Sequence, residues 1–154
     1  MSNQTLTIDS PSLPGGVRES LGRMRRAWDA GDAAAYADEF TSDATYVIFA
    51  GLVSRGRDEI RADHIPVFER WQRGTRMAMR VLDVPFVSDD VTVVLTEGGL
   101  FKGEPRRIRH DKVQTFVFVR DAKSGQWRCA AFQNTKRNRL LVALNAREKK
   151  RLAR

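Results

Sequence analysis

The spacing of the apolar residues changes once along the chain, near Gly74, and this change constrains the fold more than any other feature. Before it, apolar residues recur every three or four positions, as Val17, Leu21 and Met24 do, which is typical of one buried face of a helix. After it, apolar and polar residues alternate over long stretches, which is typical of strands with one buried face. Helices followed by strands predict an α+β domain with an antiparallel sheet and helices on one of its faces.

Turn residues divide these patterns into elements. The helical pattern predicts three helices, over residues 17–30, 33–40 and 58–71. Pro66 is expected to kink the third of them. A strand is predicted over residues 44–49, after a turn at 41–43, and the alternating pattern predicts strands over residues 76–87, 91–100, 108–120 and 127–136. The predicted organisation is a loose polar arm (1–13), one domain (14–136) and a basic tail with helical potential (137–154).

Composition excludes several classes of protein. Cys129 is the only cysteine, so an intramolecular disulfide is excluded, as expected in a reducing cytoplasm. The first residues lack the basic and apolar segments of a signal peptide, and no apolar run is long enough to cross a membrane. The two histidines, His64 and His110, are too few for most zinc sites. We therefore expect a cytoplasmic protein without a metal or a cofactor.

The net charge of +8 is concentrated at the end of the chain. From Lys136 onward there are eight basic residues and one acidic residue, Glu148, so this segment carries +7 and the rest of the chain only +1. Basic side chains can bind phosphates without sequence preference. No aromatic residues alternate with them here, so the stacking of bases is not supported. Nucleic-acid binding is accordingly the least favoured function, and a solvated terminus is the simpler interpretation.

Several short segments, in order, resemble one superfamily. They are Trp-Asp-Ala-Gly-Asp (28–32), Phe-Thr-Ser-Asp-Ala-Thr-Tyr (40–46), Gly-Arg-Asp-Glu-Ile (56–60) and the ending from Gly125 to Thr135. Their order and spacing resemble nuclear transport factor 2, ketosteroid isomerase and the SnoaL polyketide cyclases. The ending Ala-Ala-Phe-Gln-Asn-Thr (130–135), together with Thr-Phe-Val (115–117), more narrowly resembles the SgcJ/EcaC family.

This resemblance implies a cone-shaped fold, in which a curved antiparallel sheet carries three N-terminal helices on its concave face and encloses a pocket. It also implies a homodimer formed through the convex face and a link to enediyne antibiotics, whose frames are polyketides. The chain has no glycine-rich nucleotide fingerprint, so nicotinamide-dependent oxidation is not expected. The catalytic groups of ketosteroid isomerase fall on Ile48 and Met24, which cannot perform that chemistry.

Strand alternation, matched to this superfamily, assigns side chains to the pocket. On the strand over residues 108–120, the positions predicted to face the pocket are Asp111, Val113, Thr115 and Val117. On the last strand they are Trp127, Cys129, Ala131 and Gln133, and Phe132 is expected on the convex side. The complete predicted ligand-binding set is Trp28, Tyr46, Ile48, Phe68, Trp71, Thr115, Trp127, Cys129, Ala131 and Gln133. For the aromatic members, simple core packing is the alternative interpretation.

Two residues are candidates for acid–base catalysis. His64 lies on the apolar stripe of the third helix and is suited to proton transfer near neutral pH. The alternative is a structural histidine that is hydrogen-bonded to a carbonyl. Asp111 would be an acid or base if the pocket desolvates it, and otherwise would pair with Arg109 or Lys112.

These residues predict an accessory protein of enediyne-type polyketide biosynthesis. It would bind an apolar polyene or polyketide intermediate in the cone, and the scarcity of ionisable groups there favours binding, or an isomerase-like, cyclase-like or proton-transfer role, over hydrolysis. The alternative is a non-catalytic docking partner of a polyketide synthase or another biosynthetic enzyme, which would act through the convex face or the tail.

Overall fold

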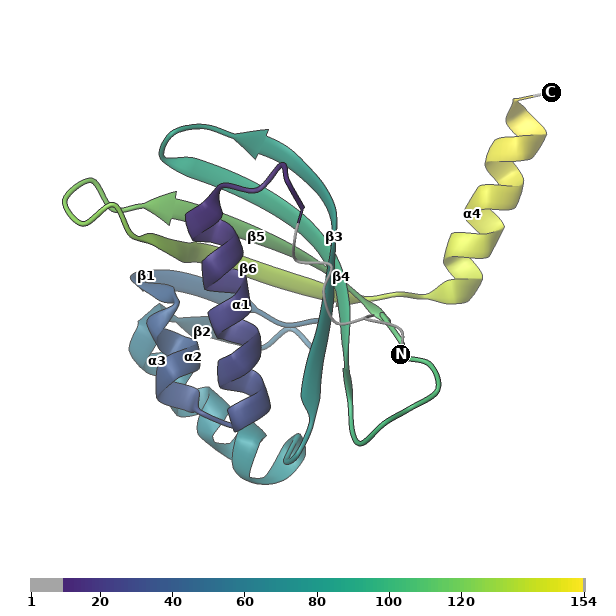
Figure 1. The fold of residues 1–154 in the computed structure, drawn as a ribbon. Helices are drawn as coiled ribbons and strands as arrows, with labels where there is room; N and C mark the ends of the chain where they lie inside the picture. The colour runs from purple at the N-terminus through teal and green to yellow at the C-terminus, as the bar shows by residue number, and fades with distance from the viewer. Residues whose placement is uncertain (1–9, 154) are drawn as a thin grey trace.

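The helices and the long strands follow one another in the predicted order, and the short strand β2 is an addition (Figure 1). The computed structural model describes residues 10–153, so most of the predicted arm (1–13) lies outside the described residues. The helices are α1 (Gly15–Ala30), α2 (Ala33–Asp38), α3 (Gly56–Pro66), the π-helix η1 (Val67–Trp71) and α4 (Arg139–Leu152). The strands are β1 (Phe40–Val47), β2 (Val53–Arg55), β3 (Arg76–Val87), β4 (Val91–Phe101), β5 (Lys112–Arg120) and β6 (Trp127–Lys136).

Local sequence explains where the helices begin and end. Gly31 ends α1 in the left-handed conformation, with φ of 65°, which glycine adopts without steric cost. The carboxylate of Asp32 then accepts a hydrogen bond from the backbone N–H of Ala35 and caps α2. At Pro66 the α-helical pattern changes to the wider π-helix η1, where the N–H of Gln72 donates to the carbonyl of Val67. The predicted irregularity at Pro66 is thus a change of helix type.

One sheet of six strands, in the order β2-β1-β6-β5-β4-β3, forms the centre of the molecule. Its pairs are antiparallel except β1 with β6, which are parallel. The predicted α+β fold with an antiparallel sheet is therefore confirmed, with a parallel pair at β1 and β6. The physical reason is the long connection between β1 and β6, which contains α3 and three other long strands and lets two strands distant in sequence run in the same direction.

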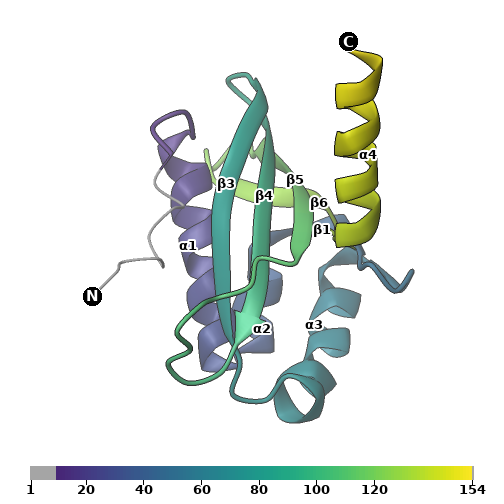
Figure 2. The ribbon, with the colours of Figure 1, turned by 90° about the vertical axis from the view of Figure 1, so that its right-hand side faces the viewer.

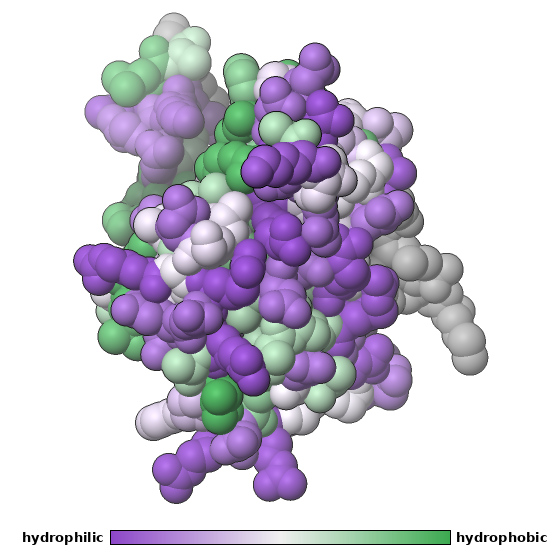
Figure 3. Space-filling view, turned by 90° about the vertical axis from the view of Figure 1, so that its left-hand side faces the viewer, coloured by the Kyte–Doolittle hydropathy of each residue, from purple (hydrophilic) through white to green (hydrophobic). Residues whose placement is uncertain are grey.

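The helices α1, α2 and α3 cover one face of the sheet, which we call the inner face (Figure 1). The opposite face, called the outer face, is covered by no helix of residues 10–153, and α4 projects from the end of β6 on that side (Figures 1 and 2). The side of the molecule shown in Figure 3 is mainly hydrophilic.

The core lies between the helices and the inner face. Its largest fully buried side chains are Phe40, Phe116, Phe118, Leu21, Met24 and Ile60. Leu13, the last residue of the predicted arm, is also buried and belongs to this core.

Strand β6 contains one residue more than its partner β5 at the centre of the sheet. Phe118 pairs with Cys129 and Val117 pairs with Ala131, so Ala130 is left without a partner on β5. Such a β-bulge interrupts the alternation of side chains. Before the bulge, Trp127 and Cys129 are buried on the inner face. After the bulge, Phe132 is the residue buried on this face.

Candidate functional site

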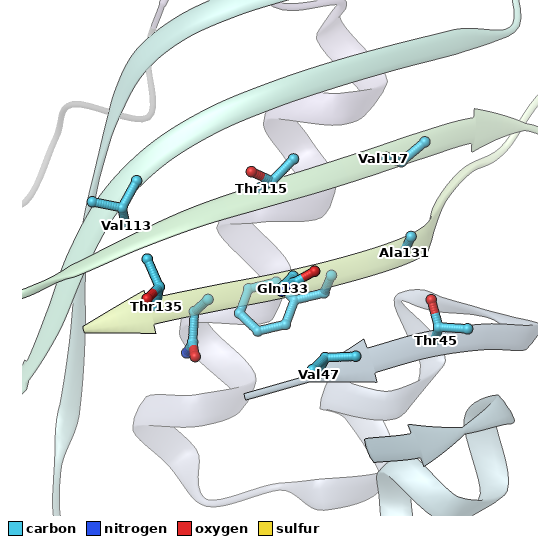
Figure 4. A pocket seen from close by; sticks show the side chains of 10 residues that line it. Thr45, Val47, Val113, Thr115, Val117, Ala131, Gln133 and Thr135 are labelled. Carbon is cyan, nitrogen blue, oxygen red and sulfur yellow. The ribbon is translucent and has the colours of Figure 1, made fainter. Parts of the chain in front are cut away.

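The structure places the predicted site residues in two groups on opposite faces of the sheet. The inner group is buried with the core and consists of Trp28, Tyr46, His64, Phe68, Trp127 and Cys129. Ile48 is partly buried and packs against the same core. The outer group, Thr115, Ala131 and Gln133, lies on the helix-free face (Figure 4). The single pocket that was predicted from the sequence is therefore divided by the sheet.

The predicted inward orientation of the outer group is wrong, and so is the outward orientation of Phe132. On β5 the larger Phe116 and Phe118 occupy the inner face, so Val113, Thr115 and Val117 face outward. On β6 the bulge at Ala130 reverses the alternation, so Ala131 and Gln133 face outward and Phe132 is buried.

Trp71 and Asp111 also lie away from the inner group. Trp71 is 75% exposed, because the wider turns of η1 rotate it off the stripe that contains Ile60 and His64. The carboxylate of Asp111 lies 3.2 Å from the ammonium of Lys112, which is one of the two ion pairs that the sequence analysis proposed for it.

A chain of hydrogen bonds runs through the inner group. His64 Nδ1 lies 2.7 Å from the carbonyl of Ile60, and His64 Nε2 lies 3.3 Å from the hydroxyl of Tyr46. The Tyr46 hydroxyl is 3.0 Å from that of Tyr36. A neutral His64 that donates from Nδ1 and accepts at Nε2 satisfies every contact, with Tyr36 donating to Tyr46 and Tyr46 to His64. The hydrogen bond from His64 to a carbonyl is the arrangement of a structural histidine.

Burial keeps the ionisable groups of this hydrogen-bonded chain neutral. It lowers the pKa of His64 below its ordinary 6.5, although the hydrogen bond to Ile60 and the charge of Asp63 act in the opposite direction. It raises the pKa values of Tyr36 and Tyr46 well above 10. It also raises the pKa of the Cys129 thiol to about 12, so the thiol behaves as a small buried apolar group.

Aromatic rings fill the space around this chain of hydrogen bonds. The rings of Trp28 and Phe68 meet edge to face, with their centroids 4.9 Å apart. The ring of Tyr46 stacks on that of Phe132, with a centroid distance of 4.5 Å. The indole N–H of Trp28 donates to the hydroxyl of Thr75 at 3.0 Å. Ring pairs of this kind stabilise a packed interior. The residues predicted to line an open cone therefore form the core itself.

A groove of about 380 Å³ lies on the outer face instead. It runs along β1, β6 and β5 and is open to solvent (Figure 4). Its lining consists of Thr45, Val47, Val113, Thr115, Val117, Ala131, Phe132, Gln133, Asn134 and Thr135. None of these residues is charged. The groove thus offers apolar surface with a few neutral hydrogen-bonding groups.

A buried carboxylate lies at one end of this face. Glu97 pairs with Val113 across β4 and β5 and therefore lies on the outer face. Its side chain is 3% exposed and forms ion pairs with Arg80 and with Arg137, the latter at 2.5 Å. Burial by itself would raise the pKa of Glu97, but the hydrogen bond from Arg80 and the charges of both arginines outweigh it and lower the pKa.

Sequence reasoning missed Tyr36 and the arginine partners of Glu97. The spacing of four between Tyr36 and Phe40 was a signal that Tyr36 faces the core. Nothing in the sequence indicated that Arg80 and Arg137, 57 positions apart, meet at Glu97. Within residues 10–153, no group of three or more histidine, cysteine, aspartate or glutamate side chains is arranged to hold a metal. In the same range, no helix has the length and apolar character needed to cross a membrane.

Helices packed on one face of a curved, mostly antiparallel six-stranded sheet define the NTF2-like fold, also described as cystatin-like. A domain of unknown function from Nostoc punctiforme, with a cystatin-like fold, is similar with a TM-score of 0.74 and 21% identity, over 91% of this chain and 88% of that one. An NTF2-like protein from Novosphingobium aromaticivorans has a TM-score of 0.64 and 19% identity, over 80% of each chain. Aln2 from a Streptomyces species has a TM-score of 0.69 and 18% identity, over 87% of this chain and 97% of that one.

No protein-family model and no curated protein matches the sequence. The similarity to solved structures therefore establishes the fold alone.

Proposed function

We propose that the protein is a non-catalytic accessory protein that binds protein partners through its outer face and α4. One observation carries this proposal: the groups suited to chemistry are buried and neutral in a filled interior, whereas an uncharged apolar surface is open to solvent. The centres of protein interfaces are depleted of charged residues in the same way. A shallow, open groove also suits a macromolecular partner better than a small ligand, which needs an enclosing pocket.

The biological setting follows from the resemblance to the SgcJ/EcaC family. We place the protein in the cytoplasm, in enediyne-type polyketide biosynthesis, where its partner would be a polyene-forming polyketide synthase or another enzyme of that pathway. The order of the short segments quoted above supports this setting, and the burial of the acid–base groups supports a role in docking.

The experiment compares an outer-face variant with an inner-chain variant in a reconstituted synthase reaction. Thr115→Lys places a charge in the groove at an exposed position, so the fold is retained. It should lower the amount of polyene product severalfold. His64→Asn retains a donor to the Ile60 carbonyl and should leave the product unchanged at pH 7. Loss of product with folded His64→Asn, but not with Thr115→Lys, would contradict the proposal.

A second candidate function is proton transfer to a polyene or polyketide bound in the cone, with His64 as the acid or base. The hydrogen-bonded chain Tyr36–Tyr46–His64 favours it, because it links a buried histidine to two hydroxyl groups that can donate and accept protons. Such a ligand would have to displace aromatic rings around the chain. Calorimetric titration with a conjugated tetraene fatty acid tests this candidate: binding that is lost in Tyr46→Phe and retained in Thr115→Lys would favour the cone over the outer face.

A further inference from the structure

A cluster of charged side chains around Glu97 lies outside the groove, at one end of the outer face. None of its members is among the residues that line the groove. The two oxygens of the Glu97 carboxylate bind different arginines. Oε1 accepts from Nε and Nη2 of Arg80, and Oε2 lies 2.5 Å from Nη2 of Arg137. One carboxylate therefore holds two guanidinium groups side by side.

Both arginines keep hydrogen-bond donors available at the surface. The side chain of Arg80 is 51% exposed and that of Arg137 is 36% exposed, whereas the carboxylate between them is buried. Apart from Glu97, neither guanidinium has a hydrogen-bond or ion-pair partner within residues 10–153. A guanidinium carries more donors than this one carboxylate accepts. The cluster thus presents free donors and an excess of positive charge to solvent.

The ring of His110 borders this cluster. Burial and the charges of Arg80 and Arg137 lower the pKa of His110 below its ordinary 6.5, while the charge of Glu97 and a hydrogen bond to the Ile108 backbone act in the opposite direction. Because charges act strongly only at short range, the ring lies close to all three charged side chains. Its Nε2 atom is buried and has no hydrogen-bond partner in the described part of the chain. Such an orphaned polar atom is rare in folded proteins and marks a place where a ligand can bind.

The connection between β4 and β5 fixes His110 against the sheet. This segment crosses the outer face of β4 (Figure 2) at Gly99, where a Cβ atom would lie 1.9 Å from the carbonyl oxygen of Arg109. On the other side of His110, the carbonyl of Asp111 accepts from the N–H of Arg137 at 2.8 Å. The imidazole and the two guanidinium groups are therefore held at one place by three different segments of the chain.

We propose that this cluster binds the phosphate group of a small molecule. The N–H groups of arginine match the oxygens of a phosphate in pairs, and a protonated imidazole supplies one more donor. Donors from three side chains suit the three acceptor oxygens of a phosphate group better than the two of a carboxylate. Glu97 is then a positioning residue, because it orients both guanidinium groups. The inference is independent of the proposed function, since it uses neither the groove nor α4.

Isothermal titration calorimetry of the full chain with inorganic phosphate at pH 7 tests the inference. The wild type should bind phosphate saturably at one site and should bind acetate more weakly. Arg80→Gln should weaken phosphate binding by about tenfold or more, because hydrogen bonds from a charged group to the anion are lost. Arg120→Gln is the matched control, since Arg120 is similarly exposed and pairs with Asp90 at the other end of β5. It should bind phosphate as the wild type does.

The pH dependence of binding tests the contribution of His110. The charged groups that act on its ring are Arg80 on β3, Glu97 on β4 and Arg137 after β6. Sulfate is the probe, because this tetrahedral dianion does not itself titrate near neutral pH. A bound anion favours the protonated imidazole, so sulfate should bind more tightly as the pH falls from 8 to 5. His110→Gln leaves the ion pairs of Glu97 in place and should remove this dependence.

Three results would overturn the inference. They are the absence of saturable binding of phosphate and sulfate, an equal loss of affinity in Arg80→Gln and Arg120→Gln, and acetate binding as tight as that of phosphate. Circular dichroism verifies that each variant is folded. Arg80→Lys keeps the charge beside Glu97 but loses the paired donors, so it replaces Arg80→Gln if that variant does not fold. Glycerol phosphate distinguishes the source of the phosphate group: tighter binding than inorganic phosphate indicates an ester, and equal binding indicates the free ion.

Discussion

The two faces of the sheet differ in the size and the burial of their side chains. The inner face carries large aromatic side chains such as Phe116 and Phe118, which are almost completely buried. The outer face carries smaller residues such as Thr115 and Val117, which line an open groove. These four residues are consecutive on β5, so each face takes alternate positions of one strand.

This difference assigns most of the folding stability to the inner face and leaves the outer face available for the proposed binding. Large side chains on the inner face contribute most of the free energy of folding, because they remove apolar surface from water and fill the core. The outer face contributes little to the isolated chain and is therefore free to bind another surface. If the faces are divided in this way, the largest effects on stability should come from substitutions on the inner face.

Phe116→Ala should lower the free energy of unfolding by about 3–5 kcal/mol, because it leaves a cavity in a packed core. Thr115→Ala, its neighbour on the outer face, should change it by less than about 0.5 kcal/mol. Urea unfolding followed by circular dichroism measures both. Equal losses in the two variants would show that the faces do not differ in this way.

Tyr46→Phe should lower the free energy of unfolding by about 1–3 kcal/mol, because the hydroxyl of Tyr36 and Nε2 of His64 both lose a partner in the core. The double variant Tyr36→Phe/Tyr46→Phe should recover part of this loss, since one unsatisfied group is removed. A double-mutant cycle from urea unfolding measures the coupling. Strictly additive losses would indicate that the hydroxyl chain is not a connected network.

Glu97→Gln tests the charged end of the outer face. It should lower the free energy of unfolding at pH 7 by about 1 kcal/mol, because Arg80 and Arg137 are partly exposed and solvent screens the pairs. The pKa of Glu97 is lowered in the folded protein. The ionised side chain therefore stabilises the fold above the ordinary pKa of 4.5, and this stabilisation is lost as the pH falls through the pKa of Glu97 in the folded protein. The difference between wild type and variant should therefore shrink in acid. A difference that stays constant down to pH 2 would contradict this assignment.

The smallest expected effect is the contribution of His64 to the pH dependence of stability, and His64→Asn tests it. The folded pKa of His64 is lowered, so the unfolded chain binds more protons below the ordinary value of 6.5 and the protein loses stability as the pH falls through that range. The variant should show a shallower loss between pH 6.5 and pH 5. His110→Gln is the comparison, because the pKa of His110 is also lowered but the residue lies outside the core. A slope unchanged by His64→Asn would show that His64 titrates normally.

The sequence predicted the fold more successfully than the site. The change of apolar spacing at Gly74 gave the order of the elements, and the predicted bounds of β3 and β6 are those observed. The carbonyl partner of His64 and the lysine partner of Asp111 were also among the predicted alternatives. The orientations of Thr115, Ala131 and Gln133 were wrong.

The amino-acid sequence by itself determined which long segments are helical and which are extended, because these properties depend on spacing and on local residues such as Gly31 and Pro66. Only the tertiary structure decided which face of the sheet each side chain takes. One unpaired residue, Ala130, reverses the alternation of β6, and its lack of a partner depends on how β6 pairs with β5. That register is set by the packing of Phe116, Phe118 and Phe132 under the helices. This packing cannot be predicted from a local sequence pattern.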